Sequence, residues 1–324
     1  MKYKHIFGPV SSYRLGRSLG IDLIPYKTCS YNCIYCECGE TTMKTVEREY
    51  FFPEEEVISE LRSILSTSPE LDSVTFAGSG EPTLSLSLGS VISMVKEEFP
   101  HYTISVLTNG SLLYLPDVTE ELLSADRVIP TLTSAVQETF ERIHRPHPSL
   151  KINTIIDGME AFRRHYTGEI WLEVFIIPGL NTTEDELLRL REAILRVRPD
   201  IVQLNTLDRP APEGWVQAAS ETELLDIREL LGVEGIEIVN RKRSISGSGG
   251  GGGEGEEMIA AMLCRRPSTI EDIIRITGMP GGEVAKLLRD LEARGEIRSV
   301  RGERGVFYSS CQLNESDPEE KKTR

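Results

Sequence analysis

Three cysteines near the start of the sequence have a spacing that suits metal chemistry. Cys29, Cys33 and Cys36 form the pattern C-x3-C-x2-C directly after an apolar run at residues 18–25. Three thiolates on one short loop can bind three corners of a [4Fe–4S] cubane, which leaves the fourth iron open. That iron can chelate the methionine end of S-adenosylmethionine (SAM). One electron then breaks a C–S bond and gives a 5′-deoxyadenosyl radical, which abstracts hydrogen from carbon.

Zinc is the alternative for these thiols. Structural zinc sites use four ligands in two separated pairs, whereas three cysteines crowd into one loop here and no other C-x2-C occurs. Cys38 could supply a fourth ligand and close such a site. A disulfide framework would spread the six cysteines along the chain. We therefore expect iron–sulfur chemistry, with Cys38 as a bystander thiol.

The elements that must position this loop follow from hydrophobic patterning. Amphipathic helical patterns, such as 53–67 and 183–198, alternate with apolar runs that predict buried strands. Thr183 is the expected cap of the second helix, and acidic residues in its first turn suit the helix dipole. Strand–helix alternation predicts an α/β fold with a parallel sheet and right-handed crossovers. The expected strands are 18–25, 73–78, 102–108, 126–132, 169–177 and 200–206.

With the aromatic Tyr35 before its last cysteine, the motif resembles that of the radical SAM superfamily. The stretch from Arg14 to Cys36 is similar to a narrower group of uncharacterised archaeal and bacterial iron–sulfur oxidoreductases, which are grouped with the wyosine-forming tRNA enzymes. The resemblance covers residues 5–245. It implies a partial (β/α)6 TIM-like barrel with the active site at the carboxyl ends of the strands. It also implies two cofactors, a [4Fe–4S] cluster on Cys29, Cys33 and Cys36 and SAM, with Tyr35 near the adenine.

Two further segments resemble SAM-binding motifs of the superfamily. Ser79, Gly80 and Glu81 follow the second strand and resemble the GGEP motif, with Ser79 in place of its first glycine. The resemblance implies that this segment receives the methionine amino group; the alternative is a tight turn with a solvated glutamate. Thr108 and Asn109 end the third strand and resemble a TNG segment near the cofactor. A simple strand-to-helix turn explains the Asn-Gly pair equally well.

Other candidates follow later strands. Thr131 ends the fourth strand, where relatives usually carry Ser-Leu-Asp, and it keeps the hydroxyl expected to reach SAM. Thr133 lacks the carboxylate of the relatives, so the sequence assigns no catalytic residue. Glu173 can point into the barrel, but an outward position is favoured. Asn205 ends the sixth strand and is expected near the substrate.

One compact group stands apart from the strand ends. His144, Arg145 and His147 could bind an anionic substrate. Solvated loop residues are the favoured reading of this group.

The composition changes sharply after the barrel. Residues 246–257 are rich in glycine and predict a flexible linker between a core domain at 1–245 and a second domain. Helical patterns at 258–266, 268–278 and 281–295, followed by a hairpin at 296–310, predict a winged helix-turn-helix domain at 258–312. Residues 313–324 are expected to be disordered.

Charge and hydropathy limit the partners. The net charge of −15 disfavours anionic membranes and bulk nucleic acid. No apolar run suits a membrane helix or signal core, so we expect a cytoplasmic protein. The predicted winged helix can contact nucleic acid through Arg298, Arg301 and Arg304, but docking of a protein or substrate is favoured. The other expected partners are a flavodoxin- or ferredoxin-type electron donor and a macromolecular substrate.

Two rival functions follow from the same residues. One is a tRNA-base-modifying enzyme of the wyosine type, which needs a second cluster; no cysteine precedes Cys29 to bind one. The other is a non-enzymatic regulator in which a redox-sensing cluster governs a DNA-binding winged helix. Turnover of SAM distinguishes this regulator from an enzyme.

Overall fold

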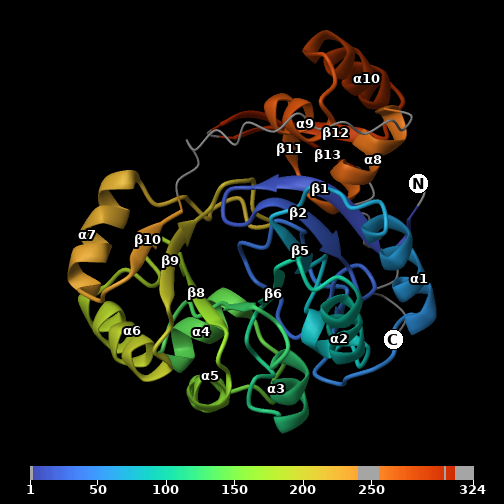
Figure 1. The fold of residues 1–324 in the computed structure, drawn as a ribbon. Coiled ribbons are helices and arrows are strands. Elements are labelled where there is room, and N and C mark those ends of the chain that lie inside the picture. Colours follow the sequence, from blue (N-terminus) through green and yellow to red (C-terminus); the bar gives the residue numbers. More distant parts are fainter. Residues whose placement is uncertain (1–2, 240–254, 303, 311–324) are drawn as a thin grey trace, which may run out of the picture.

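One curved, open sheet of eight strands organises the larger part of the molecule (Figure 1). The computed structural model describes residues 3–239, 255–302 and 304–310. Every neighbouring pair in the sheet is parallel except β1 and β2, which are antiparallel. In sheet order, the strands are β1 (Ile6–Ser12), β2 (Gly16–Ile21), β5 (Ser73–Phe76), β6 (Ile104–Thr108), β7 (Arg127–Pro130), β8 (Glu169–Ile176), β9 (Ile201–Thr206) and β10 (Ile236–Ile238).

The six predicted strands all occur, so the α/β fold with a parallel sheet is confirmed. The sheet has two strands more than predicted, β1 and β10, and both lie at its edges. β1 contains Gly8 and Pro9 and is mostly half-buried, a composition that edge strands tolerate but that gives no apolar run. β10 has only three residues, none fully buried. Edge position therefore explains why the sequence pattern missed them.

Helices cover the outer side of this sheet (Figure 1). α1 shows why they pack there, because Val57, Leu61 and Leu65 recur at helical spacing and are buried. The predicted cap Thr183 accepts a hydrogen bond from the backbone N–H of Glu186. The helices are α1 (Glu54–Leu65), the 3-10 turn η1 (Pro82–Leu84), α2 (Leu88–Glu98), α3 (Pro116–Leu122), α4 (Gln137–His144), α5 (Ile152–His165), α6 (Glu184–Val197) and α7 (Glu221–Leu231).

A smaller unit, here called the C-terminal module, spans Gly255–Ser310. Its apolar core is separate from that of the large sheet. Its three strands pair antiparallel in the order β11-β13-β12. The elements are α8 (Gly255–Arg265), β11 (Ser268–Thr269), α9 (Ile270–Thr277), α10 (Gly281–Ala293), β12 (Ile297–Gly302) and β13 (Gly305–Ser310).

The start of the module corrects one predicted boundary. Residues 255–257 were assigned to the linker but form the first turn of α8, where Glu256 and Glu257 suit the positive end of the helix dipole. The rest of the predicted linker, 246–254, and the predicted tail, 313–324, lie outside the described residues. No helix in the described part of the chain is long and apolar enough to cross a membrane.

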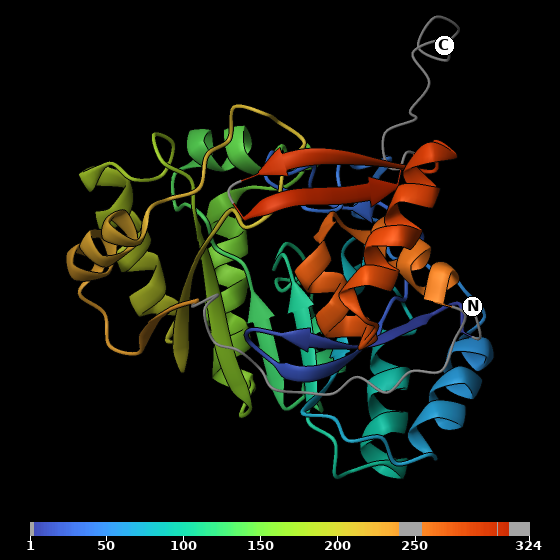
Figure 2. The ribbon, with the colours of Figure 1, turned by 90° about the horizontal axis from the view of Figure 1, so that it is seen from above.

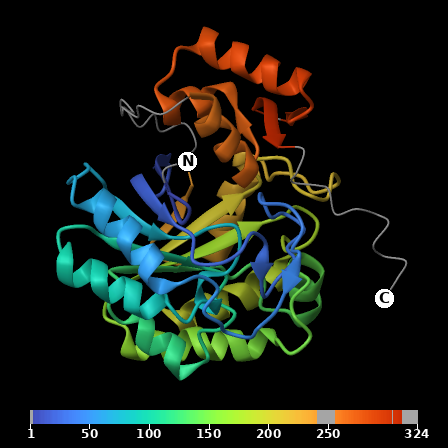
Figure 3. The same cartoon turned by 90° about the vertical axis from the view of Figure 1, so that its right-hand side faces the viewer.

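The module packs against the β1 edge of the open sheet and against the segment that follows β9. On the β1 side, Arg275 of α9 donates to the hydroxyl of Tyr13 at 2.8 Å. On the β9 side, Arg209 forms an ion pair with Asp272 of α9 at 3.1 Å, and both side chains are almost fully buried. Figure 2 shows the β12–β13 hairpin reaching over the segment that follows β9, and Figure 3 shows the module on one side of the sheet. A buried ion pair and a hydrogen bond thus join the two units, between which the sequence predicted a flexible linker.

Candidate cluster and cofactor site

The three motif cysteines lie on a loop between β2 and α1. Cys29 ends the short strand β3 (Thr28–Cys29), which pairs with β4 (Met43–Lys44). Cys33 and Cys36 follow in a turn closed by the N–H of Cys36 and the carbonyl of Cys33 at 3.2 Å. All three thiols are free and half-buried. The structure therefore brings the predicted ligands together on one ordered loop.

The end of α4 holds this loop in place. The backbone N–H groups of Asn32 and Ile34 donate to the carbonyls of His144 and Ile143, at 2.9 and 3.0 Å. The N–H of His147 donates to the carbonyl of Ser30 at 2.8 Å. Backbone groups of His144 and His147 thus hold the cysteine loop in place. The sequence pattern favoured solvated loop residues for this group and did not indicate this role.

Each motif sulfur has one side-chain nitrogen within hydrogen-bonding distance. The three nitrogens come from parts of the chain that are distant in sequence. The pairs are Lys27 Nζ with Cys36 Sγ at 3.1 Å, His144 Nδ1 with Cys33 Sγ at 3.2 Å, and Asn109 Nδ2 with Cys29 Sγ at 3.5 Å.

Burial and neighbouring charge separate the pKa values of these groups. Burial raises the pKa of Cys29 to about 12. A hydrogen bond from Cys38 is the main cause that lowers the pKa of Cys36 to about 5, against the effect of burial and with help from Lys27. Burial lowers the pKa of His144 to about 3, so its ring is neutral at physiological pH. Burial alone would lower the pKa of Lys27, but the surrounding sulfurs raise it, so the ammonium stays charged.

The donor set fits an iron–sulfur cluster better than a single ion. Among the described residues, no three His, Cys, Asp or Glu side chains are arranged to hold one metal ion. A cubane instead binds each thiolate through a different iron, and three thiols are available on this loop.

The segment after β5 packs directly on the cysteine loop. The N–H of Glu81 donates to the carbonyl of Thr28 at 3.1 Å. A Cβ atom at Gly80 would lie 1.9 Å from that same carbonyl oxygen, so this position requires glycine. The N–H and hydroxyl of Ser79 donate to the buried carboxylate of Asp22. The close contact of this segment with the backbone of Thr28 explains why the motif contains glycine at position 80.

The side chain of Glu81 is the centre of a buried network and is only 1% exposed. Its Oε1 accepts from the N–H and hydroxyl of Thr83 and from the hydroxyl of Thr108, at 3.1, 2.6 and 2.6 Å. Its Oε2 accepts from the N–H of Asn109 at 2.6 Å. Burial raises the pKa of Glu81 although these bonds oppose the shift. The carboxylate thus ties the end of β5 to the end of β6, and a solvated glutamate is excluded.

A second polar cluster lies between β7, β8 and β9. Glu173 Oε1 accepts from Arg14 at 2.7 Å and from Asn205 at 3.0 Å, and Oε2 accepts from the hydroxyl of Thr131 at 2.9 Å. The favoured outward position of Glu173 is therefore wrong, because its carboxylate is largely buried among these partners. Although burial would raise the pKa of Glu173, the charge of Arg14 and the hydrogen bonds lower it.

Tyr35 lies beside this cluster. Its ring stacks on Phe175 of β8, with centroids 3.9 Å apart and planes 14° from parallel. This stacking fixes the orientation of the Tyr35 ring, which precedes the last cysteine of the motif.

Comparisons with known proteins identify the family of this chain. The sequence model of the radical SAM superfamily matches residues 23–192, more than half of the chain. The chain is 34% identical to a UPF0026 protein of Methanocaldococcus jannaschii, over 72% of this chain and 74% of that one. It is 36% identical to a UPF0026 protein of Helicobacter pylori strain J99, over 82% and 86%.

A further relative is much longer than this chain. A Brachyspira hyodysenteriae protein named GTPase Obg is 36% identical over 92% of this chain, which spans only 44% of it. That name describes the longer protein. The present sequence has no Gly-Lys pair, which a phosphate-binding loop of the G-x4-G-K-[ST] type requires.

Solved structures share the fold at low identity. A radical SAM methyltransferase from Sphaerobacter thermophilus has a TM-score of 0.51 at 16% identity, over 71% of this chain and 68% of that one. Streptococcus suis SuiB, bound to precursor peptide SuiA, has a TM-score of 0.51 at 12% identity, over 68% and 47%. The fold, the cysteine loop and the sequence matches together show that this chain belongs to the radical SAM superfamily, with the UPF0026 proteins among its relatives.

Proposed function

We propose that this protein binds one [4Fe–4S] cluster through Cys29, Cys33 and Cys36 and cleaves SAM reductively to give a 5′-deoxyadenosyl radical. The radical then acts on a substrate that remains to be identified. When bound, such a cluster supplies one electron to the sulfonium of SAM. The observation that carries the proposal is the contact of the cysteine loop with the Glu81 segment, which joins the two cofactor motifs.

Glu81 is proposed to accept the methionine amino group of SAM. From the described residues, Oε1 accepts three hydrogen bonds, whereas Oε2 accepts one. A carboxylate oxygen has about two lone-pair sites, so Oε2 keeps capacity for an ammonium group. Thr108 and Asn109 support this role by fixing the carboxylate, and the backbone of Ser79 and Gly80 completes the segment.

The polar cluster around Glu173 is proposed to contact the remaining polar groups of SAM. Thr131 donates to Glu173, which leaves its oxygen lone pairs as acceptors for a ribose hydroxyl. Arg14 is half-buried and places a positive charge beside the same carboxylate. Tyr35, stacked on Phe175, is proposed to border the adenine.

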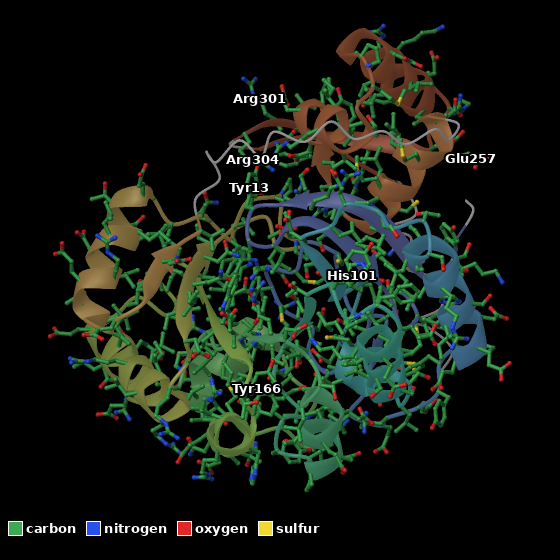
Figure 4. The ribbon with its side chains drawn as sticks, viewed as in Figure 1. Tyr13, His101, Tyr166, Glu257, Arg301 and Arg304 are labelled. Carbon is green, nitrogen blue, oxygen red and sulfur yellow. The ribbon has the colours of Figure 1, made fainter. Side chains whose placement is uncertain are left out.

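The C-terminal module is proposed to be a winged helix that docks a macromolecular substrate. Its helix order and β12–β13 hairpin support this reading. Of the arginines proposed to reach phosphate, Arg304 instead pairs with Asp208 at 2.9 Å and Asp272 at 3.2 Å. In Figure 4, Arg304 lies beside Tyr13 at the boundary with the sheet, and Arg301 lies farther out. Loss of Arg304 from the available cations favours docking of protein or substrate over nucleic acid.

The wyosine-type reaction and the redox regulator remain the alternatives. The first would need cysteine ligands for a second cluster, and none precedes Cys29. The second would bind a cluster without turning over SAM. An electron donor of the flavodoxin or ferredoxin type is the expected reductant for the proposed reaction.

Anaerobic reconstitution tests the proposal. Wild-type protein should bind about four irons and four sulfides, and after reduction with dithionite it should release 5′-deoxyadenosine and methionine from SAM. Cys29→Ala, Cys33→Ala and Cys36→Ala should each abolish the cluster, whereas Cys38→Ala is the matched control and should keep it. Stoichiometric zinc would contradict the cluster, about eight irons would favour the wyosine type, and a cluster without SAM cleavage would favour the regulator.

A further inference from the structure

The three nitrogens beside the motif sulfurs have separate origins in the chain. Lys27 precedes β3, Asn109 follows β6 and His144 ends α4. None belongs to the sequence motif of the cysteines. Each nitrogen reaches a different sulfur, so the fold distributes one N–H donor to every thiol of the set.

The charged side chain of Lys27 is directed at the cysteine sulfurs. Its side chain is 2% exposed, a position that lysine rarely occupies without a partner. Among the described residues its ammonium has a hydrogen bond to Cys36 Sγ and no ion pair with a carboxylate. Its backbone is held in the left-handed region at φ 58°, where its N–H donates to Ser79 and its carbonyl accepts from Thr42. The chain thus maintains an uncommon conformation that directs a cation at the sulfurs.

Asn109 is oriented by its own neighbours. Its Oδ1 accepts from the N–H of Ser111 at 2.9 Å, so the opposite side of the amide must be the donor. That donor, Nδ2, contacts Ser30 Oγ at 2.8 Å and Cys29 Sγ at 3.5 Å.

His144 is fixed by aromatic packing. Its ring lies 4.9 Å from Tyr31 and 5.4 Å from Phe140, centroid to centroid, and it is 2% exposed. Its Nδ1 lies 3.2 Å from Cys33 Sγ, and with a proton on Nδ1 the ring donates to that sulfur.

We propose that Lys27, Asn109 and His144 are positioning residues that hydrogen-bond to the cluster thiolates, and that Lys27 sets the reduction potential of the cluster. The inference rests on the proposed function, because it requires a cluster on these cysteines. One electron converts [4Fe–4S]2+ to [4Fe–4S]1+ and adds one negative charge, with no bond made or broken in the protein. A cation and N–H donors at the sulfurs stabilise the more negative state, so they raise the potential.

Redox titration of the reconstituted protein tests this role without SAM or substrate. At the wild-type midpoint potential, Lys27→Met should decrease the ratio of reduced to oxidised cluster at least tenfold. For one electron this corresponds to a midpoint potential that is lower by at least ~59 mV. Lys27→Arg should restore most of the ratio and Lys27→Gln only part, because glutamine keeps an N–H but no charge. Lys44→Met is the matched control. It removes an exposed lysine of β4 that donates to the carbonyls of Arg145 and Pro146, and it should leave the potential unchanged.

The outcomes separate the inference from the proposed function. If wild-type protein binds no [4Fe–4S] cluster, the proposed function fails and the inference falls with it. If the cluster forms but Lys27→Met and Lys44→Met have the wild-type potential, only the inference is overturned. If Lys27→Met does not fold, equal potentials for Lys27→Arg and Lys27→Gln overturn it. His144→Phe keeps the packing, and loss of the D2O-sensitive Fe–S stretch in resonance Raman spectra would support the N–H bond to Cys33.

Discussion

Replacement of Arg209 should weaken the packing of the C-terminal module on the sheet. The side chain of Arg209 is 6% exposed and makes three polar contacts, two of which cross the boundary to the module. It pairs with Glu37 of the cysteine loop at 3.1 Å and with Asp272 of α9 at 3.1 Å, and it donates to the carbonyl of Pro267 at 2.6 Å. Arg209→Met keeps most of the side-chain volume and removes the charge, so both carboxylates lose their shared partner.

The magnitude follows from what Asp272 retains. Removing one partner of a buried ion pair costs about 3–5 kcal/mol, since the other charge stays buried. Asp272 keeps Arg304 and Arg275, each at 3.2 Å, so the lower end applies. The pKa of Asp272 gives a second measure. Although burial would raise it, Arg209 and Arg304 lower it from 3.8 to about 2, which corresponds to roughly 2 kcal/mol. We expect Arg209→Met to lower the free energy of unfolding by about 3 kcal/mol.

Denaturant unfolding and amide hydrogen exchange would measure this effect. The loss should be accompanied by faster exchange in α9 and in the cysteine loop near Glu37. Arg196→Met is the matched control, because Arg196 pairs with Asp157 and Glu160 on the exposed surface and should cost less than 1 kcal/mol. An Arg209→Met stability within 1 kcal/mol of this control, with unchanged exchange in α9, would refute the reasoning.

Three further predictions concern the same sites. Glu81→Gln should weaken SAM binding by ~1.5–3 kcal/mol and keep the cluster absorbance, which isothermal titration would check; normal affinity would remove Glu81 from the cofactor site. Gly80→Ala should reduce the iron bound per chain, because the new Cβ meets the Thr28 carbonyl, and a full iron count would contradict that contact. Since the folded pKa of Asp272 is depressed, its contribution is complete above pH 3.8 and is lost as the pH falls toward about 2. Melting temperatures across this range should therefore fall less steeply for Arg209→Met than for wild type.

Much of the sheet, and the segments proposed to bind the cofactors, could be located because their sequence signals are local. A buried parallel strand is an apolar run, and the cysteines and the Ser79–Glu81 segment are contiguous in sequence. The glycine at position 80 also has a local cause, namely the close approach of one backbone to another.

The supporting residues could not be predicted because their partners are distant in sequence. Lys27 is two residues from Cys29 but contacts Cys36, and His144 contacts Cys33 from 111 residues away. The inward position of Glu173 depends on Arg14, whose contact requires the β1–β2 turn, and β1 itself escaped the pattern. The docking of the C-terminal module could not be predicted for the same reason. In the sequence, Asp272 is only an acidic residue in the first turn of a helix, and its partner Arg209 is 63 residues away.

The ion pairs of Arg209 form at different times during synthesis of the chain, because their partners are made at different times. Glu37 beside the cysteines is held by Arg209, and Arg209 is held by Asp272, which is synthesised more than 60 residues later. Residues 246–310 take roughly 3–13 s to be made at about 5–20 residues per second. During that interval the strands from β1 to β10 are complete while the cysteine loop lacks its last support. Docking of the newly made module then completes the ion pairs that hold the cysteine loop.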